Sequence, residues 1–317
     1  MKRLLALAFA ALLSTAAAAQ YPDRPIRFIV PQAAGSATDN VARLLAPEMA
    51  KQLGQQLLVE NRPGGALTIG IDAVAKASPD GYTIGMGPIG AMAITRHMVA
   101  KLPYDIERDL QPIALVSRGH IVLAVSPTLP IRTVAELIEH AKRSPGRLMN
   151  ASSSNGSPGH VAGELFKHMT GTSIVHVPYK GGAMAINDLI AGHVHVMWES
   201  VNSMGPHVRS GRVRALAVGS PKRSAGFPEV PTLAESVPGY EATTWTGVIG
   251  PAGLPRPIVD KLNASVNAAI RTPLFKERFE ANGDEAGGGS PEEFAALIRR
   301  DSLRWAEVVK RSGARID

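Results

Sequence analysis

Small, hydroxyl and amide residues gather in three short loops of this chain, where they could bind an anion. The first loop runs from Ala33 to Ala37 and contains Gly35 and Ser36. The second is SSSNGSPGH at 152–160, and the third is PYKGG at 178–182. Small residues let a ligand approach the main chain, and serine and asparagine side chains donate hydrogen bonds. The loops therefore predict recognition of a carboxylate or a phosphate.

Each loop lies between a predicted strand and a predicted helix. The apolar run IRFIV at 26–30 is typical of a buried strand, and the pattern after the first loop predicts a helix over 41–53. Thr38 or Asp39 is the expected N-cap of that helix, and Asp39 is expected to pair with Arg43 rather than with a ligand. The unpaired N–H groups of such a first turn attract negative charge.

Apolar runs and helical patterns alternate along most of the chain. Further strands are predicted at 57–59, 82–86, 121–125, 148–151, 174–177, 194–198 and 213–218, and further helices at 133–143, 159–169, 183–191, 255–270 and 291–310. This alternation predicts an α/β fold with parallel sheets of the doubly wound type. We expect two lobes, one formed by 20–120 plus 229–317 and the other by 121–228, with a ligand cleft between them.

The first 19 residues are typical of a secretory signal peptide. Lys2 and Arg3 precede an apolar stretch, and Ala17 and Ala19 form an Ala-x-Ala cleavage site before Gln20. We therefore expect a periplasmic protein that is cleaved near Ala19. The sequence contains no cysteine, which excludes disulfides, thiolate metal sites and thiol catalysis.

Charge and composition narrow the class of partner. The formal net charge of +7 is spread along the chain, and aromatic residues make up only 5%. A nucleic-acid partner is therefore not expected, because basic residues neither cluster nor alternate with aromatic ones. A mild positive field suits a small anion instead. We expect a monomer that needs no cofactor.

A series of ordered segments extends over nearly all of the chain after the signal: YPDRPIRFIVP at 21–31, VENRPGG at 59–65, AKASPDGYTI at 75–84, LPYDIERDLQPIALV at 102–116, SSSNGSPGH at 152–160, VHVPYKGG at 175–182 and TWTGVIGPAGLP at 244–255. In these segments the chain resembles the Bug-type periplasmic receptors of tripartite tricarboxylate transporters. The resemblance implies a type II Venus-flytrap fold without catalytic activity. It also implies capture of a small organic carboxylate and its delivery to membrane transporter subunits.

The loops and the resemblance together define the expected ligand site. Its residues are Ala34, Gly35, Ser36, Ala37, Ile89, Gly90, Ser153, Ser154, Asn155, Ser157, Tyr179, Lys180, Glu199, Trp245 and Thr246. Gly35 is the one glycine left of a pair that is usual in the family, and Ser154 replaces a family glycine. Ile89 and Gly90 stand where many members have hydroxyl residues. These departures disfavour a strongly polar ligand such as citrate, and Trp245 favours a partly apolar one.

Two other classes of function are open to test. Serines at 152–154 and 157 with His160 could belong to an exported serine hydrolase, although the sequence has no G-x-S-x-G motif and local proximity of serine and histidine is weak evidence. His193, His195 and Glu199 alternate along a predicted strand, so they could bind a metal. Short motifs of this kind have low specificity.

Overall fold

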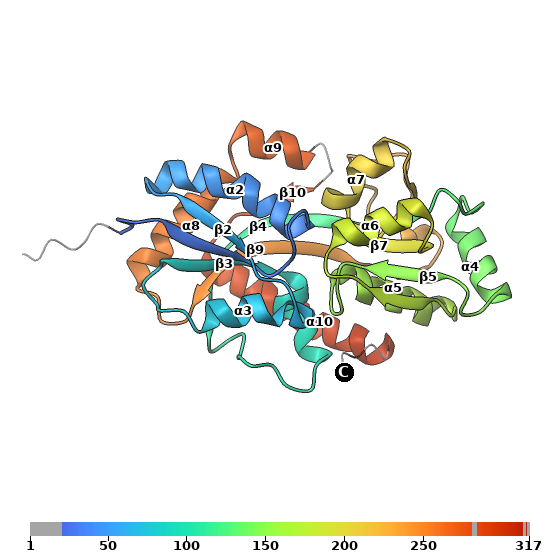
Figure 1. The fold of residues 1–317 in the computed structure, drawn as a ribbon, viewed down its shortest axis with the longest axis horizontal. Helices are drawn as coiled ribbons and strands as arrows, with labels where there is room; N and C mark the ends of the chain where they lie inside the picture. Colours follow the sequence, from blue (N-terminus) through green and yellow to red (C-terminus); the bar gives the residue numbers. More distant parts are fainter. Residues whose placement is uncertain (1–20, 281–283, 313–314, 316–317) are drawn as a thin grey trace, which may run out of the picture.

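The computed structural model describes residues 21–280, 284–312 and 315, which form two lobes side by side (Figure 1). The signal-peptide prediction lies outside these residues. The strands are β1 (Ile26–Val30), β2 (Leu57–Asn61), β3 (Thr83–Pro88), β4 (Leu110–Val125), β5 (Met149–Ser152), β6 (Val175–Pro178), β7 (Val196–Ser200), β8 (Arg214–Val218), β9 (Thr243–Pro251) and β10 (Glu285–Ala286).

Helices cover the sheets on both faces, as the alternating pattern predicts (Figure 1). They are α2 (Ala37–Leu53), α3 (Thr68–Ala75), α4 (Val134–Arg143), α5 (Pro158–Thr170), α6 (Gly182–Ala191), α7 (Val201–Arg209), α8 (Arg256–Ala269), α9 (Pro273–Glu280) and α10 (Pro291–Ser312). Single turns form η1 (Gly65–Leu67), η2 (Gly90–Ile94), η3 (Thr95–His97) and η4 (Leu233–Glu235). Among the described residues, no helix combines the length and the apolar character needed to cross a membrane.

The strand order is β2-β1-β3-β9-β4-β7-β5-β6. Parallel pairs join β1 to β2 and β3 in the first lobe, and β5 to β6 and β7 in the second. The strands between these sets are antiparallel, because β9 pairs with β3 and β4, and β4 pairs with β7 and β8. The two-lobed α/β fold is therefore confirmed, and each lobe has the expected parallel strands, but antiparallel strands that the pattern did not predict join them.

The long strand β4 runs through both lobes. Its pairing with β9 ends at His120 opposite Thr243, and its pairing with β7 begins at Ile121 opposite Ser200. The sequence pattern did not predict β9 or the first half of β4. Gly247 and Gly250 in β9 lower strand propensity, and Pro112 interrupts the apolar run in β4.

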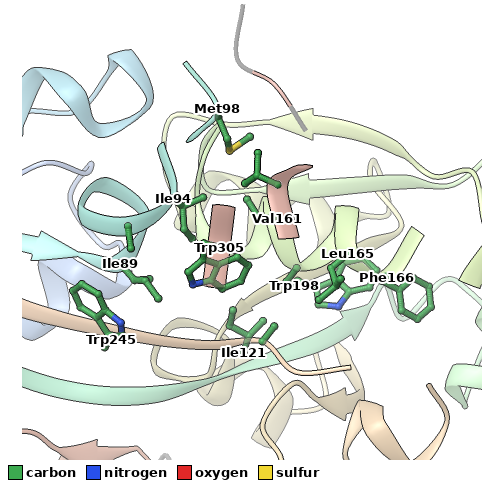
Figure 2. Close-up of a cluster of buried hydrophobic side chains, with 14 of the residues drawn as sticks. Ile89, Ile94, Met98, Ile121, Val161, Leu165, Phe166, Trp198, Trp245 and Trp305 are labelled. Carbon is green, nitrogen blue, oxygen red and sulfur yellow. The ribbon is translucent and has the colours of Figure 1, made fainter. Parts of the chain in front are cut away.

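A continuous core fills the space behind these crossing strands. Figure 2 shows the cluster, in which Ile94 comes from η2, Trp198 from β7 and Trp305 from α10. Helix α10 packs against η2 in the first lobe and against α5 in the second. The two lobes are thus joined by two strands and by a buried apolar cluster, which leaves the opposite edge of the contact free to form a cleft.

Candidate functional site

The first helix begins earlier than the sequence suggested. Ser36, not Thr38 or Asp39, is the N-cap of α2, because its Oγ accepts a hydrogen bond from the N–H of Asp39 at 3.2 Å. The helix therefore starts at Ala37 and turns its first N–H groups toward the second lobe. Gly35 adopts φ +77°, a left-handed conformation that glycine accepts without steric cost.

Asp39 holds the first loop in place. It accepts hydrogen bonds from Gly35 N at 2.8 Å, from Arg43 Nε at 3.0 Å and from Asn61 Nδ2 at 2.8 Å. Burial acts to raise its pKa, but the bonds from Arg43, Asn61 and Gly35 outweigh it and lower the pKa below its ordinary value. The predicted pairing of Asp39 with Arg43 is confirmed, and its carboxylate is already fully occupied within the first lobe.

Two helices of the second lobe begin opposite this loop. Ser157 caps α5 by accepting from His160 N at 3.2 Å, and α6 begins after Gly181 without a side-chain cap. A methyl group at Gly159 would lie 1.9 Å from the carbonyl oxygen of Trp198, so glycine is required for the start of α5 to sit against β7. The N-termini of α2, α5 and α6 therefore all point into the region between the lobes.

The lobes touch around these helix starts. A methyl group at Gly35 would lie 3.6 Å from Ala183 Cβ, and one at Gly181 would lie 3.0 Å from Ala33 Cβ. Near η2, a methyl group at Gly90 would lie 3.1 Å from the carbonyl oxygen of Gly156. Backbones of the two lobes thus approach each other closely at small residues, as expected for a cleft that has closed.

A cavity of about 50 Å³ lies between the lobes beneath these contacts. Its lining consists of Gln32, Ala37, Thr38, Val41, Leu67, Pro88, Ser117, Gly119, Ile121, Ser153, Pro158, Gly159, Glu199, Ser200, Asn202, Thr244, Trp245, Thr246 and Asp284. The ionisable residues in this set are Glu199 and Asp284, so the described lining contains two acids and no cationic side chain. Attraction for an anion would therefore have to come from backbone dipoles at the helix starts rather than from lysine or arginine.

A second pocket of about 460 Å³ forms a wider mouth outside the cavity, since Gln32, Leu67 and Ser153 line both. The other residues of the mouth are Pro31, Pro63, Gly64, Gly65, Ala66, Ser154, Asn155, Pro178, Tyr179 and Lys180. The mouth and the cavity together reach the size range of small-molecule sites.

Three buried polar atoms at this cleft have no hydrogen-bond partner in the described structure. They are Thr246 Oγ1 from the first lobe, and Ser154 Oγ and Glu199 Oε2 from the second. A buried polar atom without a partner costs free energy, so native structures rarely leave one unexplained. Polar groups of a ligand between the lobes would satisfy all three.

The two acids of the cavity both have a raised pKa. Burial raises the pKa of Glu199 to about 7, although the Ser200 N–H and the nearby Ser153 hydroxyl act to lower it. Burial likewise raises the pKa of Asp284 to about 7 against the opposing effect of bonds from His120 N and Asn202 Nδ2. Both carboxyls are therefore partly protonated near neutral pH.

The structure brings many of the predicted site residues together. Those lining the cavity are Ala37, Ser153, Glu199, Trp245 and Thr246, and those lining the mouth are Ser153, Ser154, Asn155, Tyr179 and Lys180. Ala34, Gly35 and Gly90 lie at or beside the contacts between lobes.

Four predicted residues have structural partners of their own. Ser36 and Ser157 are helix caps, as described above. The Trp245 indole N–H donates to Asp301 Oδ2 at 2.6 Å, so the ring is a fixed wall of the cavity. Tyr179 donates to Asp188 Oδ2 at 2.5 Å. Ile89 is buried in the core cluster (Figure 2).

Sequence reasoning missed several residues of the lining. Asn202 follows β7 at the start of α7, so the strand-to-helix logic of the three loops could have found it. Asp284 reaches the cavity from a distant segment, where its Oδ2 accepts from Asn202 Nδ2 at 3.2 Å. Nothing in the sequence around Asp284 signals this position.

The hydrolase interpretation finds no support in this geometry. Ser157 Oγ accepts from the backbone of His160, whose ring accepts from Gly156 N at 3.2 Å and stacks on His176 at 3.7 Å between centroids. Ser152 Oγ lies 2.7 Å from His176 Nε2, but neither histidine lines the cavity. Burial lowers the pKa of His160 to about 3 and that of His176 to about 4.

The metal interpretation is not supported by the described residues either. No three of their histidine, aspartate and glutamate side chains are grouped so as to hold an ion. His193 lies 3.3 Å from Asp188 Oδ1, and His195 Nδ1 accepts from Met149 N at 3.0 Å. Glu199, the third residue of that pattern, faces the cavity instead.

A family model, a curated relative and solved structures all match this chain over most of its length. Residues 41–314 match the model of the tripartite tricarboxylate transporter family receptor. Protein BugT of Bordetella pertussis is 37% identical, over 100% of this chain and 99% of its own. Rpa4515 of R. palustris, solved with adipate, is 36% identical with a TM-score of 0.91, over 93% of this chain and 100% of that one. MatC of Rhodopseudomonas palustris, with bound malate, is 31% identical with a TM-score of 0.88, over 91% and 100%.

Proposed function

Because the chain belongs to the tripartite tricarboxylate transporter receptor family, we propose that it is a periplasmic receptor that captures a small organic carboxylate between its lobes and delivers it to membrane transporter subunits. The unpartnered polar atoms in the cleft carry this proposal, because they come from both lobes and belong to residues that line the cavity or its mouth. The adipate and malate bound to the two solved relatives support the same ligand class.

In this receptor both lobes contact the ligand. The N–H groups of Ala37 and Thr38 and the hydroxyl of Thr246, in the first lobe, donate hydrogen bonds to one carboxylate. Ser153, Ser154 and Glu199 contact the ligand from the second lobe. Trp245 and Val41 supply apolar walls, which suit the methylene groups of a dicarboxylate better than the hydroxyl-rich surface of citrate.

The lobes of the receptor are 20–120 plus 229–317 and 121–228 in this proposal, since β4 changes its pairing partner after His120. The cleft then opens and closes by bending of β4 and β9. The receptor is exported by a signal peptide cleaved near Ala19. It acts as a monomer, without a cofactor and without catalysis, and the membrane partners supply the energy for transport.

Ligand screening tests the proposal directly. The mature protein is mixed with adipate, malate, citrate, a diamine and a neutral sugar, and the melting temperature is recorded, followed by calorimetric titration of each hit. We expect adipate or malate to raise the melting temperature and to bind with micromolar or better affinity, since a few charge-assisted hydrogen bonds of about 1.5–3 kcal/mol each are sufficient. Stabilisation by the diamine or the sugar and by no carboxylate would refute it.

A pair of matched variants locates the site. Thr246→Val removes a hydroxyl that has no partner in the fold, so it should weaken carboxylate binding while leaving the melting temperature of the free protein unchanged or higher. Thr172→Val removes a buried hydroxyl that lies 2.8 Å from Thr170 Oγ1, away from the cleft. It should lower the melting temperature and leave affinity unchanged. The reverse result would place the site elsewhere.

A further inference from the structure

An acid in the cleft of a carboxylate receptor presents an electrostatic conflict. Glu199 and Asp284 line the cavity, and the described lining contains no cationic side chain to balance them. Lys180 lines the mouth and not the cavity. If both acids were ionised, a ligand carboxylate entering the cavity would meet two like charges at low dielectric. The cleft therefore needs another way to remove negative charge before an anion can bind.

The surroundings of Glu199 leave one of its oxygens available. On β7, its side chain is buried, and Oε1 accepts from Ser200 N at 2.8 Å. Oε2 has no hydrogen-bond partner in the described structure. It points to the start of α6, where a methyl group at Gly182 would lie 3.2 Å away. Because Glu199 lines the cavity, a ligand bound there is the group that could supply the missing partner.

The groups packed around Glu199 come from four elements. Ser153 follows β5, Gly159 begins α5, Gly182 begins α6, and Val122 of β4 lies opposite in the sheet. None of the four carries a charged side chain. The other titratable group in the cavity is Asp284, which is an acid. The α6 N-terminus favours negative charge, so it can attract either an ionised Glu199 or a ligand carboxylate.

We propose that Glu199 binds the ligand as a neutral carboxylic acid, whose Oε2–H donates a hydrogen bond to a carboxylate oxygen of the ligand. This inference rests on the proposed carboxylate-receptor function and deepens it. A proton on Glu199 removes one of the two like charges and converts the unpartnered acceptor into a donor, which is what a carboxylate requires. Proton binding at Glu199 and ligand binding are then coupled, and each strengthens the other.

Glu199 is better placed than Asp284 for this role. Asp284 Oδ1 accepts from His120 N at 3.3 Å, and Oδ2 accepts from Asn202 Nδ2 at 3.2 Å, so both of its oxygens have donors from the protein. These contacts tie Asp284 to β4 and α7. The pKa of Glu199, raised by burial to about 7, means that the neutral form is abundant at pH 6.5 and scarce at pH 8.5.

Calorimetric titration with adipate across pH tests the coupling. Measurements at pH 6.5, 7.5 and 8.5 keep adipate ionised, because ordinary carboxyls titrate near about 4.3. The apparent Kd equals the intrinsic Kd divided by the competent fraction, so we expect binding at pH 8.5 to be about 20-fold weaker than at pH 6.5. Repeating the titration at pH 8.5 in buffers of different ionisation enthalpy should show uptake of about one proton per adipate.

Two variants show whether Glu199 or Asp284 binds the proton that is coupled to ligand binding. Glu199→Gln keeps a neutral hydrogen-bond donor, so its Kd for adipate should change by less than about fivefold over the same pH range, and ionisation of Asp284 accounts for that remainder. Asp284→Asn should retain most of the pH dependence of wild type, whatever its absolute affinity. Circular dichroism and melting temperature confirm that both variants are folded.

The results separate this inference from the function it rests on. If wild-type protein binds adipate with a constant Kd and without proton uptake, the role of Glu199 is wrong and the receptor function stands. The role is also wrong if Glu199→Gln keeps the full pH dependence of wild type, or if Asp284→Asn loses more of that dependence than Glu199→Gln does. If neither adipate nor malate binds at any pH, the carboxylate-receptor function itself is wrong.

Discussion

The first loop of one lobe and the facing wall of the other each place an acid beside the same cleft, and the two acids are treated differently. Asp39 accepts three hydrogen bonds, one of them from the Arg43 guanidinium, and its pKa is lowered. Glu199 has one N–H donor, an unpartnered oxygen and a raised pKa. An anion receptor can thus neutralise a buried acid in two ways. A cation of the same lobe can pair with the acid, or the acid can bind a proton where it contacts the ligand.

This difference separates scaffold from ligand contact more reliably than distance alone. Both residues lie near a helix N-terminus, and both are buried. The distinguishing feature is whether the hydrogen-bonding capacity of the side chain is already used by the protein. Capacity that is already used indicates a structural role, and unused buried capacity indicates a role that requires a partner.

The largest effect on the free energy of unfolding is expected from substitution of Asp39. Asp39→Ala leaves Gly35 N, Asn61 and Arg43 without their shared acceptor, so the free energy of unfolding should fall by about 3 kcal/mol. Urea denaturation at pH 7 measures it. The control is Glu139→Ala, which breaks an exposed pair with Arg143 and should cost less than about 1 kcal/mol. Equal losses in the two variants would contradict the structural role of Asp39.

Removing the charge of Glu199 should raise the free energy of unfolding at high pH, whereas removing Asp39 should lower it. Because its folded pKa is raised above the unfolded value, the folded state binds the proton more tightly, and ionisation weakens the fold as pH rises from about 4.5 through 7. Relative to wild type, Glu199→Gln should therefore gain about 2 kcal/mol between pH 5 and pH 8 in the absence of ligand. Urea denaturation at both pH values measures this gain.

Glu164→Gln is the matched control for that experiment. Glu164 is buried and accepts from Lys167 Nζ at 2.7 Å, so removing its charge should destabilise the protein at pH 8. A Glu199→Gln variant that is likewise less stable than wild type at pH 8 would remove the contrast between paired and unpaired acids.

Obstructing the close approach of Gly35 to Ala183 between the lobes should lower affinity for adipate more than it lowers stability. Gly35→Leu places a branched side chain against Ala183, so closure is hindered and affinity for adipate should fall about tenfold, or about 1.4 kcal/mol. Gly54→Leu is the control, because Gly54 has a similar φ of +72° but open space around it. Both variants should lose about 1 kcal/mol of stability. Similar affinities in the two would show that the first loop does not close on the ligand.

The smallest effect is expected at the mouth. Lys180 is exposed, so its attraction for an anion is screened by solvent and salt. Lys180→Ala should weaken adipate binding about threefold at low salt and have no effect at about 1 M salt. Lys142→Ala, on α4 at the far end of the second lobe (Figure 1), should have no effect at either. A large, salt-independent loss would move Lys180 from the mouth into direct ligand contact.

Local patterns predicted the parts of the cleft that are local. The small residues of 33–37, 152–157 and 178–182 mark strand-to-helix loops, and the structure places all three at the contact between lobes. The cap at Ser36 was misplaced because Thr38 and Asp39 are equally good cap residues by type. Choice among them depends on the loop geometry, which the hydrogen bonds from Gly35 and Asn61 to Asp39 fix in the folded molecule.

Long-range features could not be predicted in the same way. Trp245 was expected as an aromatic wall, but its bond to Asp301 depends on where α10 packs. The position of Asp284 depends on β10 pairing with β4, more than 160 residues earlier in the chain. The antiparallel pairing of β9 likewise has no periodic signal in a sequence rich in glycine and threonine. The state of Glu199 depends on burial, which is a property of the folded molecule alone.

The shared strand β4 also constrains the order in which the molecule can fold. Its first half pairs with β9, which is made from residues 243–251, so this ladder cannot form until most of the chain has been synthesised. Contacts of such sequence separation slow the search for the native state. Neither lobe has a complete sheet without strand β4. Slow folding should therefore be a property of the topology itself, shared by any sequence that adopts this arrangement of strands.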